Sequence, residues 1–185
     1  MGMLWSQETY IKTLRFAAFA HRDQLVPGTP HSYLVHLASV CMEVMAVIPI
    51  TAHINGDLAI QCALLHDVLE DTKVTPVELQ TEFGLEVYKS VAALTKSALL
   101  PKAKAMHDSL TRILEEAPEV GMVKMADRIT NLQQPPGDWS REKILYYREE
   151  AQLILESLRH LSQPLGDRLA SKIANYDSFI EKDGK

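Results

Sequence analysis

The sequence lacks the features that are typical of disulfide-rich, membrane-spanning and secreted proteins. Its 185 residues contain only two cysteines, Cys41 and Cys62, which lie in separate apolar stretches and form no CxxC pattern. This favours free, buried thiols in a reducing cytoplasm over a disulfide. No run of about eighteen apolar residues predicts a membrane span, and the first residues lack the basic start and apolar run of a secretion signal. We therefore expect a cytoplasmic protein with no membrane partner.

An excess of positive charge is missing too. The chain has 19 Lys and Arg residues against 24 Asp and Glu residues, for a formal net charge of −5. This argues against a nucleic-acid partner, because such proteins carry a basic surface. It does not argue against a nucleotide substrate, because a bound cation can neutralise phosphate locally. The length predicts one domain over residues 1–185.

Alternation of apolar and polar residues long enough for a β-sheet is missing, whereas helical spacing recurs. Ser6 can cap a first helix that ends near residue 24, before a stretch rich in Pro and Gly. Thr75 to Glu78 combine a capping box with Pro at the first helical position, and Gly84 ends that helix. Further helices are expected over about 32–48, 57–71 (capped by Asp57), 85–96, 101–116, 118–133, 140–161 and 163–185. The sequence predicts an all-α, compact bundle of about eight to ten helices.

Four ionisable side chains follow one apolar stretch, residues 57–65. They are His66, Asp67, Glu70 and Asp71, and residues three or four apart share a helical face. Buried charge is costly unless it is paired or bound to a metal. Imidazole and carboxylate are also ligands that divalent Mn, Fe, Co or Zn accept. The first pair could hold a metal and the second could act on a water or substrate beside it; a chance His-Asp pair at an acidic helix end is the alternative.

Two other helical stretches each carry one metal-capable side chain among apolar neighbours. His36 lies in residues 33–40, and Asp127 lies in residues 121–129. If these stretches converge on His66 and Asp67, they supply two imidazoles and two carboxylates.

Together these segments resemble the HD superfamily of metal-dependent phosphohydrolases, and within it the hydrolase domain of RelA/SpoT enzymes. The resemblance covers roughly residues 8–160, and the HDxxED pattern at 66–71 is its most specific element. Residues 137–140, with two tyrosines following, are similar to the C-terminal part of the small stand-alone ppGpp hydrolases. The stretches that carry the likeness are Phe19–Gln24, Tyr33–His36, Ala63–Thr72 and Val123–Leu132.

The resemblance implies a single Mn²⁺ ion, or another divalent transition metal, and a small-molecule nucleotide substrate. It implies that Lys124 lies near the phosphates and that Asn131 contacts the nucleoside. The expected reaction is hydrolysis of the 3′-pyrophosphate of guanosine 3′,5′-bis(diphosphate), ppGpp. An HD-type nucleotidase, a phosphatase of a cofactor such as NADPH, and a degenerate nucleotide-binding module remain alternatives, and the oligomeric state is not indicated. The implied metal ligands are His36, His66, Asp67 and Asp127, and the implied catalytic acids are Glu70 and Asp71.

The chain departs from the family where the base is expected to bind. Relatives usually carry an Arg-Lys pair at positions 25 and 26, where this chain has Leu25 and Val26. The loop that follows is about two residues longer and contains His31, and Gln134 stands where the family has Thr. His31 and Gln134 are therefore candidate substrate contacts. We expect weaker ppGpp binding or poorer base discrimination than in relatives that carry the pair.

Three further side chains near these motifs are assigned to packing or pairing. His21, on the apolar face of the first helix, is expected to be packed and hydrogen-bonded. Arg128 could pair with a carboxylate such as Glu70 or contact the substrate. Tyr147 is expected to pack against the core.

Overall fold

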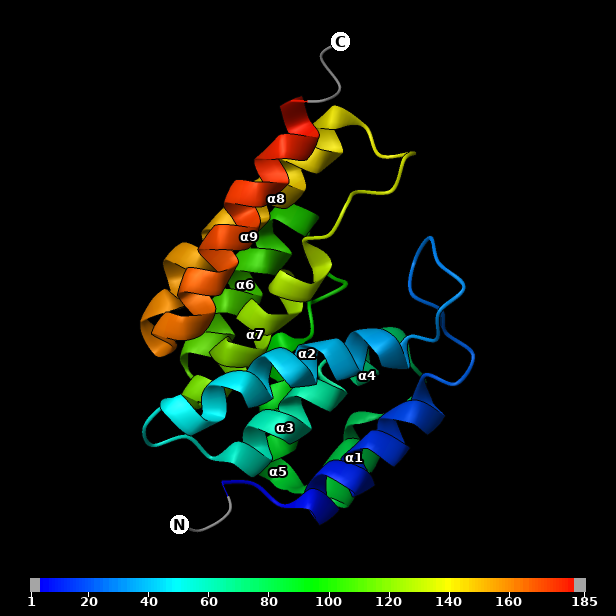
Figure 1. Ribbon diagram of the computed structural model, residues 1–185. Helices are drawn as coiled ribbons and strands as arrows, with labels where there is room; N and C mark the ends of the chain where they lie inside the picture. Colours follow the sequence, from blue (N-terminus) through cyan, green and yellow to red (C-terminus); the bar gives the residue numbers. More distant parts are fainter. Residues whose placement is uncertain (1–3, 182–185) are drawn as a thin grey trace.

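The computed structural model describes residues 4–181, and most of that range is helical (Figure 1). Within it, no strand occurs beyond one isolated bridge between Leu25 and Ser32. The predicted all-α class is confirmed, and the α-helices fall within the expected number. Residues 1–3 and 182–185 lie outside the described range. The helix expected over 163–185 is therefore described only as far as residue 181. The expectation of no secretion signal at the start of the chain falls partly on residues that are not described. The α-helices are α1 (Gln7–Ala20), α2 (Leu34–Val47), α3 (Gly56–Leu65), α4 (Val68–Asp71), α5 (Pro76–Leu94), α6 (Lys102–Leu114), α7 (Pro118–Asn131), α8 (Arg141–Leu158) and α9 (Gln163–Glu181), with short 3-10 helices η1 (Ile48–Ile50) and η2 (Arg159–Leu161).

Several helices begin at the capping residues that the sequence predicts. The Ser6 hydroxyl accepts the Thr9 N–H at the start of α1, and Ser140 caps α8 in the same way. At α5, the Thr75 side chain accepts the Glu78 N–H while the Glu78 carboxylate accepts the Thr75 N–H. Each cap satisfies a backbone donor that the first helical turn leaves free.

Gly84 kinks α5 rather than separating two helices by a loop. Its φ of 88° and ψ of 169° are non-helical, yet helical residues continue on both sides. A side chain at this positive φ would be strained, whereas glycine adopts it freely. The end predicted at Gly84 is therefore a sharp bend.

The single helix predicted over residues 57–71 is wrong, because α3 ends at Leu65 and α4 begins at Val68. The Ala63 carbonyl accepts a hydrogen bond from His66 Nδ1 at 2.9 Å. In a continuous helix that carbonyl would accept the Asp67 N–H. The start of α3 also differs: Asn55, not Asp57, caps it by accepting the Leu58 N–H.

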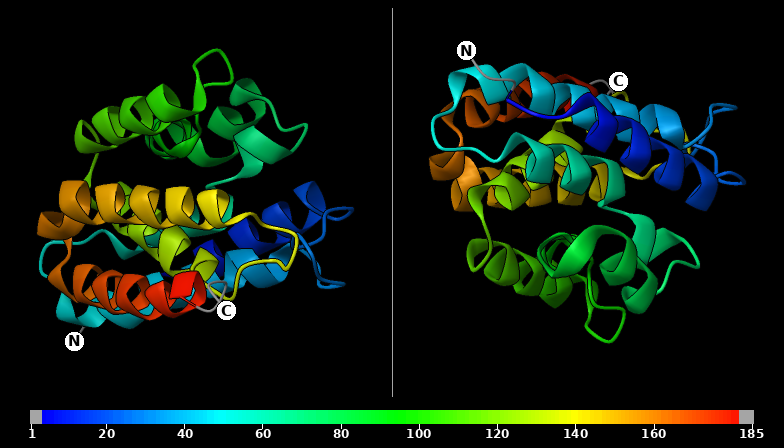
Figure 2. Two further views of the ribbon diagram at one scale, coloured as in Figure 1. Left: turned by 90° about the horizontal axis from the view of Figure 1, so that it is seen from above. Right: turned by 90° about the horizontal axis from the view of Figure 1, so that it is seen from below.

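Helices α3 and α7 form the centre of the molecule. Helix α3 packs against α1, α2, α5 and α7, while α7 also contacts α2, α6, α8 and α9. Figure 2 shows α7 between the α5–α6 pair on one side and α2 with α9 on the other. Residues 119–129 of α7 are all buried, so its polar side chains must find partners inside the protein. Among the described helices, none is both long and apolar enough to cross a membrane.

Candidate metal centre and substrate cavity

The four predicted ligands come from three parts of the chain and meet at one point. His36 lies in the first turn of α2, His66 and Asp67 form the turn between α3 and α4, and Asp127 lies in the last turns of α7. The Nε2 atoms of His36 and His66 are 3.3 Å apart. Asp67 Oδ2 lies 2.9 Å from His66 Nε2 and 3.8 Å from His36 Nε2. Asp127 Oδ1 lies 3.5 Å from His36 Nε2 and 3.8 Å from His66 Nε2.

This spacing and chemistry fit a divalent cation. Two nitrogen or oxygen donors that share one ion at about 2.1 Å lie roughly 3–3.5 Å apart. Because His66 Nδ1 donates to the Ala63 carbonyl, the lone pair of the neutral ring lies on Nε2, which faces Asp67. Metal-bound histidines usually make such a bond from their other nitrogen. The donor atoms of His36, His66 and Asp67 all lie within 4.8 Å of one another.

The charges around the cluster also favour a cation. Burial opposes an imidazolium at His66, but Asp67 and then Asp127 outweigh it and raise the pKa of His66 to about 9. At His36 burial prevails, so its pKa is lowered. Burial likewise opposes ionisation of Asp67 and Asp127, yet His66 beside the first and Lys124 beside the second lower both carboxyl pKa values. The cluster therefore keeps two carboxylates and a proton that a divalent cation would displace.

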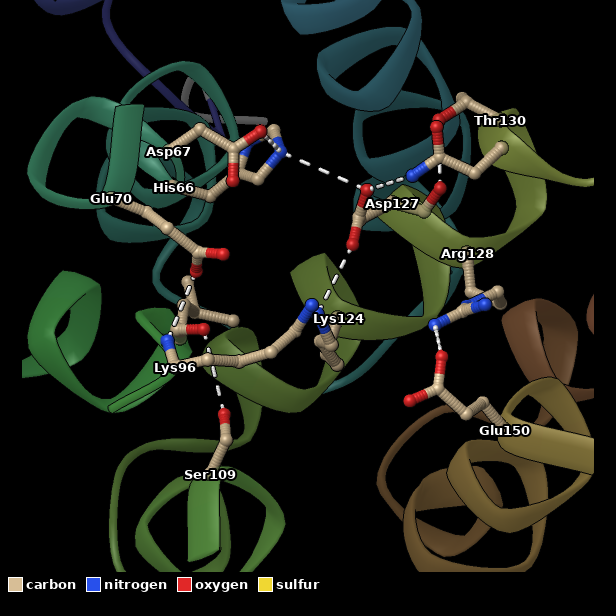
Figure 3. A network of polar contacts seen from close by, with 12 residues as sticks. His66, Asp67, Glu70, Lys96, Ser109, Lys124, Asp127, Arg128, Thr130 and Glu150 are labelled. Carbon is tan, nitrogen blue, oxygen red and sulfur yellow. Dashed lines mark hydrogen bonds and ion pairs between the residues drawn. The ribbon is translucent and has the colours of Figure 1, made fainter. Parts of the chain in front are cut away.

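Hydrogen bonds from three side chains hold the two aspartates in place. The Tyr33 hydroxyl donates to Asp67 Oδ2 at 2.5 Å, a contact that the sequence did not reveal. Lys124 Nζ donates to Asp127 Oδ2 at 3.1 Å, and Asn131 Nδ2 donates to Asp127 Oδ1 at 2.5 Å. Figure 3 shows Lys124 pointing from α7 toward Asp127. Lys124 and Asn131, predicted as substrate contacts, thus lie directly against a predicted ligand.

The two predicted catalytic acids share a small polar cavity of about 170 Å³ with three of the predicted ligands, His66, Asp67 and Asp127. His36 lines the larger cavity described below. Glu70 Oε2 accepts the backbone N–H of Lys96 at 3.0 Å, as Figure 3 shows. Asp71 Oδ2 accepts Gln24 Nε2 at 2.9 Å, and Gln24 Oε1 accepts His21 Nδ1–H at 2.6 Å. His21 is buried, as expected. One oxygen of each acid is thereby oriented, and the other has no hydrogen-bond partner among the described residues.

Arg128 does not pair with either catalytic acid. Its guanidinium lies 3.3 Å from Glu150 on α8 (Figure 3) and 4.2 Å from the ring centre of Tyr147. Arg128 follows Asp127 directly, and consecutive residues point about 100° apart around a helix, so Arg128 faces α8 when Asp127 faces the metal centre. Tyr147 is packed against Trp139, with ring centres 5.2 Å apart.

A larger cavity of about 630 Å³ adjoins the small one, and Asn131 lines both. The predicted contacts His31 and Gln134 lie on the wall of the larger cavity, together with Val26. Leu25 does not line it and is 57% exposed. The structure thus brings His31 and Gln134 beside the predicted metal centre but outside its small polar cavity.

Helix α9 supplies part of this wall, and no motif in the sequence had pointed to it. Arg168, Lys172 and Tyr176 all line the larger cavity. They lie beyond residue 160, where the family resemblance ends, and charged residues on an amphipathic helix usually face solvent. The one available signal was their spacing of four residues, which places all three on the same side of the helix.

Comparison with known proteins agrees with this geometry. Residues 13–161 match the family profile described as "HD domain". The mouse guanosine-3′,5′-bis(diphosphate) 3′-pyrophosphohydrolase MESH1 is 31% identical over 161 residues, which is 83% of this chain and 87% of the relative. The human protein of the same name is 30% identical over the same shares of both chains.

The fold has a counterpart among solved structures. A structure described as a metazoan ortholog of SpoT that hydrolyses ppGpp aligns with a TM-score of 0.78, at 24% identity, over 92% of this chain and 96% of the other. This likeness shows that the two chains share a fold. The family match over most of the chain and the MESH1 relatives show that this protein belongs to the HD-domain family.

Proposed function

We propose that this protein is a Mn²⁺-dependent phosphohydrolase that removes the 3′-pyrophosphate of guanosine 3′,5′-bis(diphosphate). The observation that carries the proposal is the convergence of two imidazoles and two carboxylates on one point, beside a small polar cavity that two further acids line. The chain's MESH1 relatives are named for this reaction.

The metal would be held by His36, His66, Asp67 and Asp127, a mixed imidazole and carboxylate set that suits Mn²⁺. When bound, the ion lowers the pKa of a bound water and polarises a phosphoryl oxygen. The protein fixes the donors beforehand: the Ala63 carbonyl sets the His66 tautomer, and Tyr33 orients Asp67. Such supporting contacts tune both the affinity and the orientation of metal ligands.

Glu70 is the proposed proton acceptor for the attacking water. The Lys96 N–H holds one carboxylate oxygen, which leaves the other directed at the small cavity. Asp71, held by Gln24, lies on the same cavity and would orient the water rather than take its proton. A proton acceptor must lie within hydrogen-bond reach of the water, and both acids line the space where it would bind.

Lys124 and Asn131 have donors or acceptors to spare beyond their bonds to Asp127. An ammonium has three donors, and Lys124 uses one for Asp127 Oδ2. A second could bind a phosphoryl oxygen in the small cavity, which Lys124 lines. Asn131 donates to Asp127 through Nδ2, which leaves its carbonyl oxygen to accept from a nucleoside. Because Asn131 lines both cavities, it would mark the junction between the pyrophosphate and the nucleoside.

A substrate panel tests the proposal. Metal-stripped protein is reloaded with Mn²⁺ and given ppGpp, pppGpp, the adenine counterparts, NADPH and simple mononucleotides, and the release of pyrophosphate and phosphate is measured. We expect pyrophosphate from ppGpp, no activity after chelation and recovery with Mn²⁺. Release of phosphate from NADPH or from a mononucleotide alone would assign the same centre to a phosphatase. Binding without turnover of any substrate would indicate a degenerate module.

A further inference from the structure

The larger cavity has two unlike walls. On the side of α2 and the 26–31 loop, the side chains that face it include Val26, Val35 and Met42. Val35 and Met42 are each 52% exposed. Because they line the cavity, these side chains form an apolar surface against which the base of a nucleotide could pack. The arginine and the lysine on this cavity, Arg168 and Lys172, come from the opposite side, from α9.

Lys172 is a cation without a partner on this wall. It is partly buried, and no carboxylate lies within ion-pair distance of its ammonium among the residues that the structure describes. A partly buried ammonium without a partner loses hydration and gains nothing in return. An anion in the cavity would supply the missing partner.

Arg168, one turn before Lys172, is anchored rather than free. Its Nε and Nη2 atoms donate to the two carboxylate oxygens of Glu43, each at 2.5 Å. Glu43 lies on α2 and is 5% exposed, so the pair ties α9 to α2 across the cavity. A guanidinium has five N–H donors, and Glu43 takes only two of them. The pair is neutral as a whole, so Lys172 carries the uncompensated charge.

The basic residues of α9 and the predicted catalytic acids line different cavities. Helix α9 contributes Arg168 and Lys172 to the larger cavity, and none of its described side chains lines the small one. His36 and Asn131 connect the larger cavity with the predicted metal centre. A volume of about 630 Å³ is in the range of pockets that hold whole small-molecule ligands, whereas about 170 Å³ lies below that range.

We propose that Lys172, helped by the free edge of Arg168, binds a second anionic group of the substrate inside the larger cavity. The ligand class is a nucleotide with phosphate on both sides of its sugar: one group reacts at the metal centre, and the other binds α9. This rests on the proposed hydrolase function and names the residues that select its substrate. It also explains how a chain without a charged residue at 25 or 26 binds a polyanion.

The test compares two substrates and two variants of equal net charge. The substrates are ppGpp and guanosine 3′-diphosphate, which has no 5′-phosphate. The variants are Lys172→Gln and the control Lys89→Gln, on the exposed side of α5 and on neither cavity. We expect Lys172→Gln to raise KM for ppGpp at least about tenfold, as for a lost charged hydrogen bond, with little change for guanosine 3′-diphosphate. Lys172→Arg should recover most of the loss, and Lys89→Gln should change neither value.

A binding measurement separates this inference from the proposed reaction. Metal-free protein is titrated calorimetrically with guanosine 5′-diphosphate, which removes any contribution of an ion. Wild type should bind at least about tenfold more tightly than Lys172→Gln. That result together with no hydrolysis of either substrate would support the α9 site and refute the hydrolase. Equal affinity of both proteins, including no binding by either, would overturn the α9 site even if ppGpp is hydrolysed.

Discussion

The two cavities of this protein are built in different ways. The small cavity is lined mainly by side chains from short motifs, namely residues 66–71 and 124–131, so its chemistry is visible in local sequence. The larger cavity collects residues from the 26–31 loop, α2, the 133–139 loop, α8 and α9, which lie far apart in the chain. Most of the small cavity's lining can therefore be read from two short motifs, whereas the lining of the larger cavity depends on which helices and loops pack together.

The largest effect should come from removing a ligand in the small cavity. His66→Ala deletes an Nε2 donor that has the other imidazole and both carboxylates within 3.8 Å. Both bound metal and turnover should fall below detection, because a divalent cation needs this nitrogen. Met42→Ala, on the larger cavity, should keep the metal. Metal content by mass spectrometry and pyrophosphate release measure the two outcomes. If His66→Ala stays loaded and active, the two cavities do not divide the work.

Changing the proposed proton acceptor should separate chemistry from metal binding. Glu70→Gln keeps the shape of the side chain and an oxygen that can accept the Lys96 N–H. We expect turnover to fall about a hundredfold or more, in the range for general acid–base groups, with metal content unchanged. Single-turnover rates on loaded enzyme measure the effect. An active, loaded Glu70→Gln enzyme would make Glu70 structural.

Features that depend on residues close together in the chain could be predicted from the sequence, whereas features that depend on helix packing could not. Helical spacing and capping residues predicted the all-α fold, because Ser6, Thr75 and Ser140 act through contacts three residues away. The break at His66 escaped prediction, because it depends on an imidazole competing for the Ala63 carbonyl. The pairing of Arg128 with Glu150 and the cavity position of Lys172 depend on which helices pack together. Local periodicity carries no information on that packing.

Removing a side chain that only holds a metal ligand in place should lower metal affinity less than removing the ligand itself. Tyr33→Phe removes the hydroxyl that donates to Asp67 Oδ2 and keeps the ring that packs 5.0 Å from His21. Loss of such a contact typically costs about 10–100-fold in metal affinity. Competition with a fluorescent chelator measures this, and Tyr88→Phe on α5, on neither cavity, serves as the control. Unchanged affinity would show that Asp67 needs no help to bind the ion.

The smallest effect, per unit of change, is expected from the dependence of metal affinity on pH. Without metal, Asp67 and its neighbours raise the pKa of His66 to about 9, so the ring is protonated at neutral pH and the ion must displace that proton. Metal affinity should therefore rise with pH, by about tenfold per unit, and level off above about 9. By the same linkage, the metal-free protein gains stability from His66 below its unfolded pKa of about 6.5 and loses it as pH rises through about 9.

Calorimetric titration between pH 6 and pH 10 measures the affinity, and thermal unfolding of the metal-free protein over the same range measures the stability. A metal affinity that does not change between pH 6 and pH 9 would mean that His66 is neutral in the metal-free protein. The carboxylates of Asp67 and Asp127, whose pKa values are lowered, should add no step within this range.

We propose above all that one ion binds between the two imidazoles and the two aspartates, where the small cavity meets the larger one. Crystals grown with Mn²⁺ and measured at the manganese absorption edge test it directly. The account predicts one strong anomalous peak in contact with His36 Nε2, His66 Nε2, Asp67 and Asp127. A peak elsewhere in the molecule, or no peak at that position in protein that hydrolyses ppGpp, would contradict it.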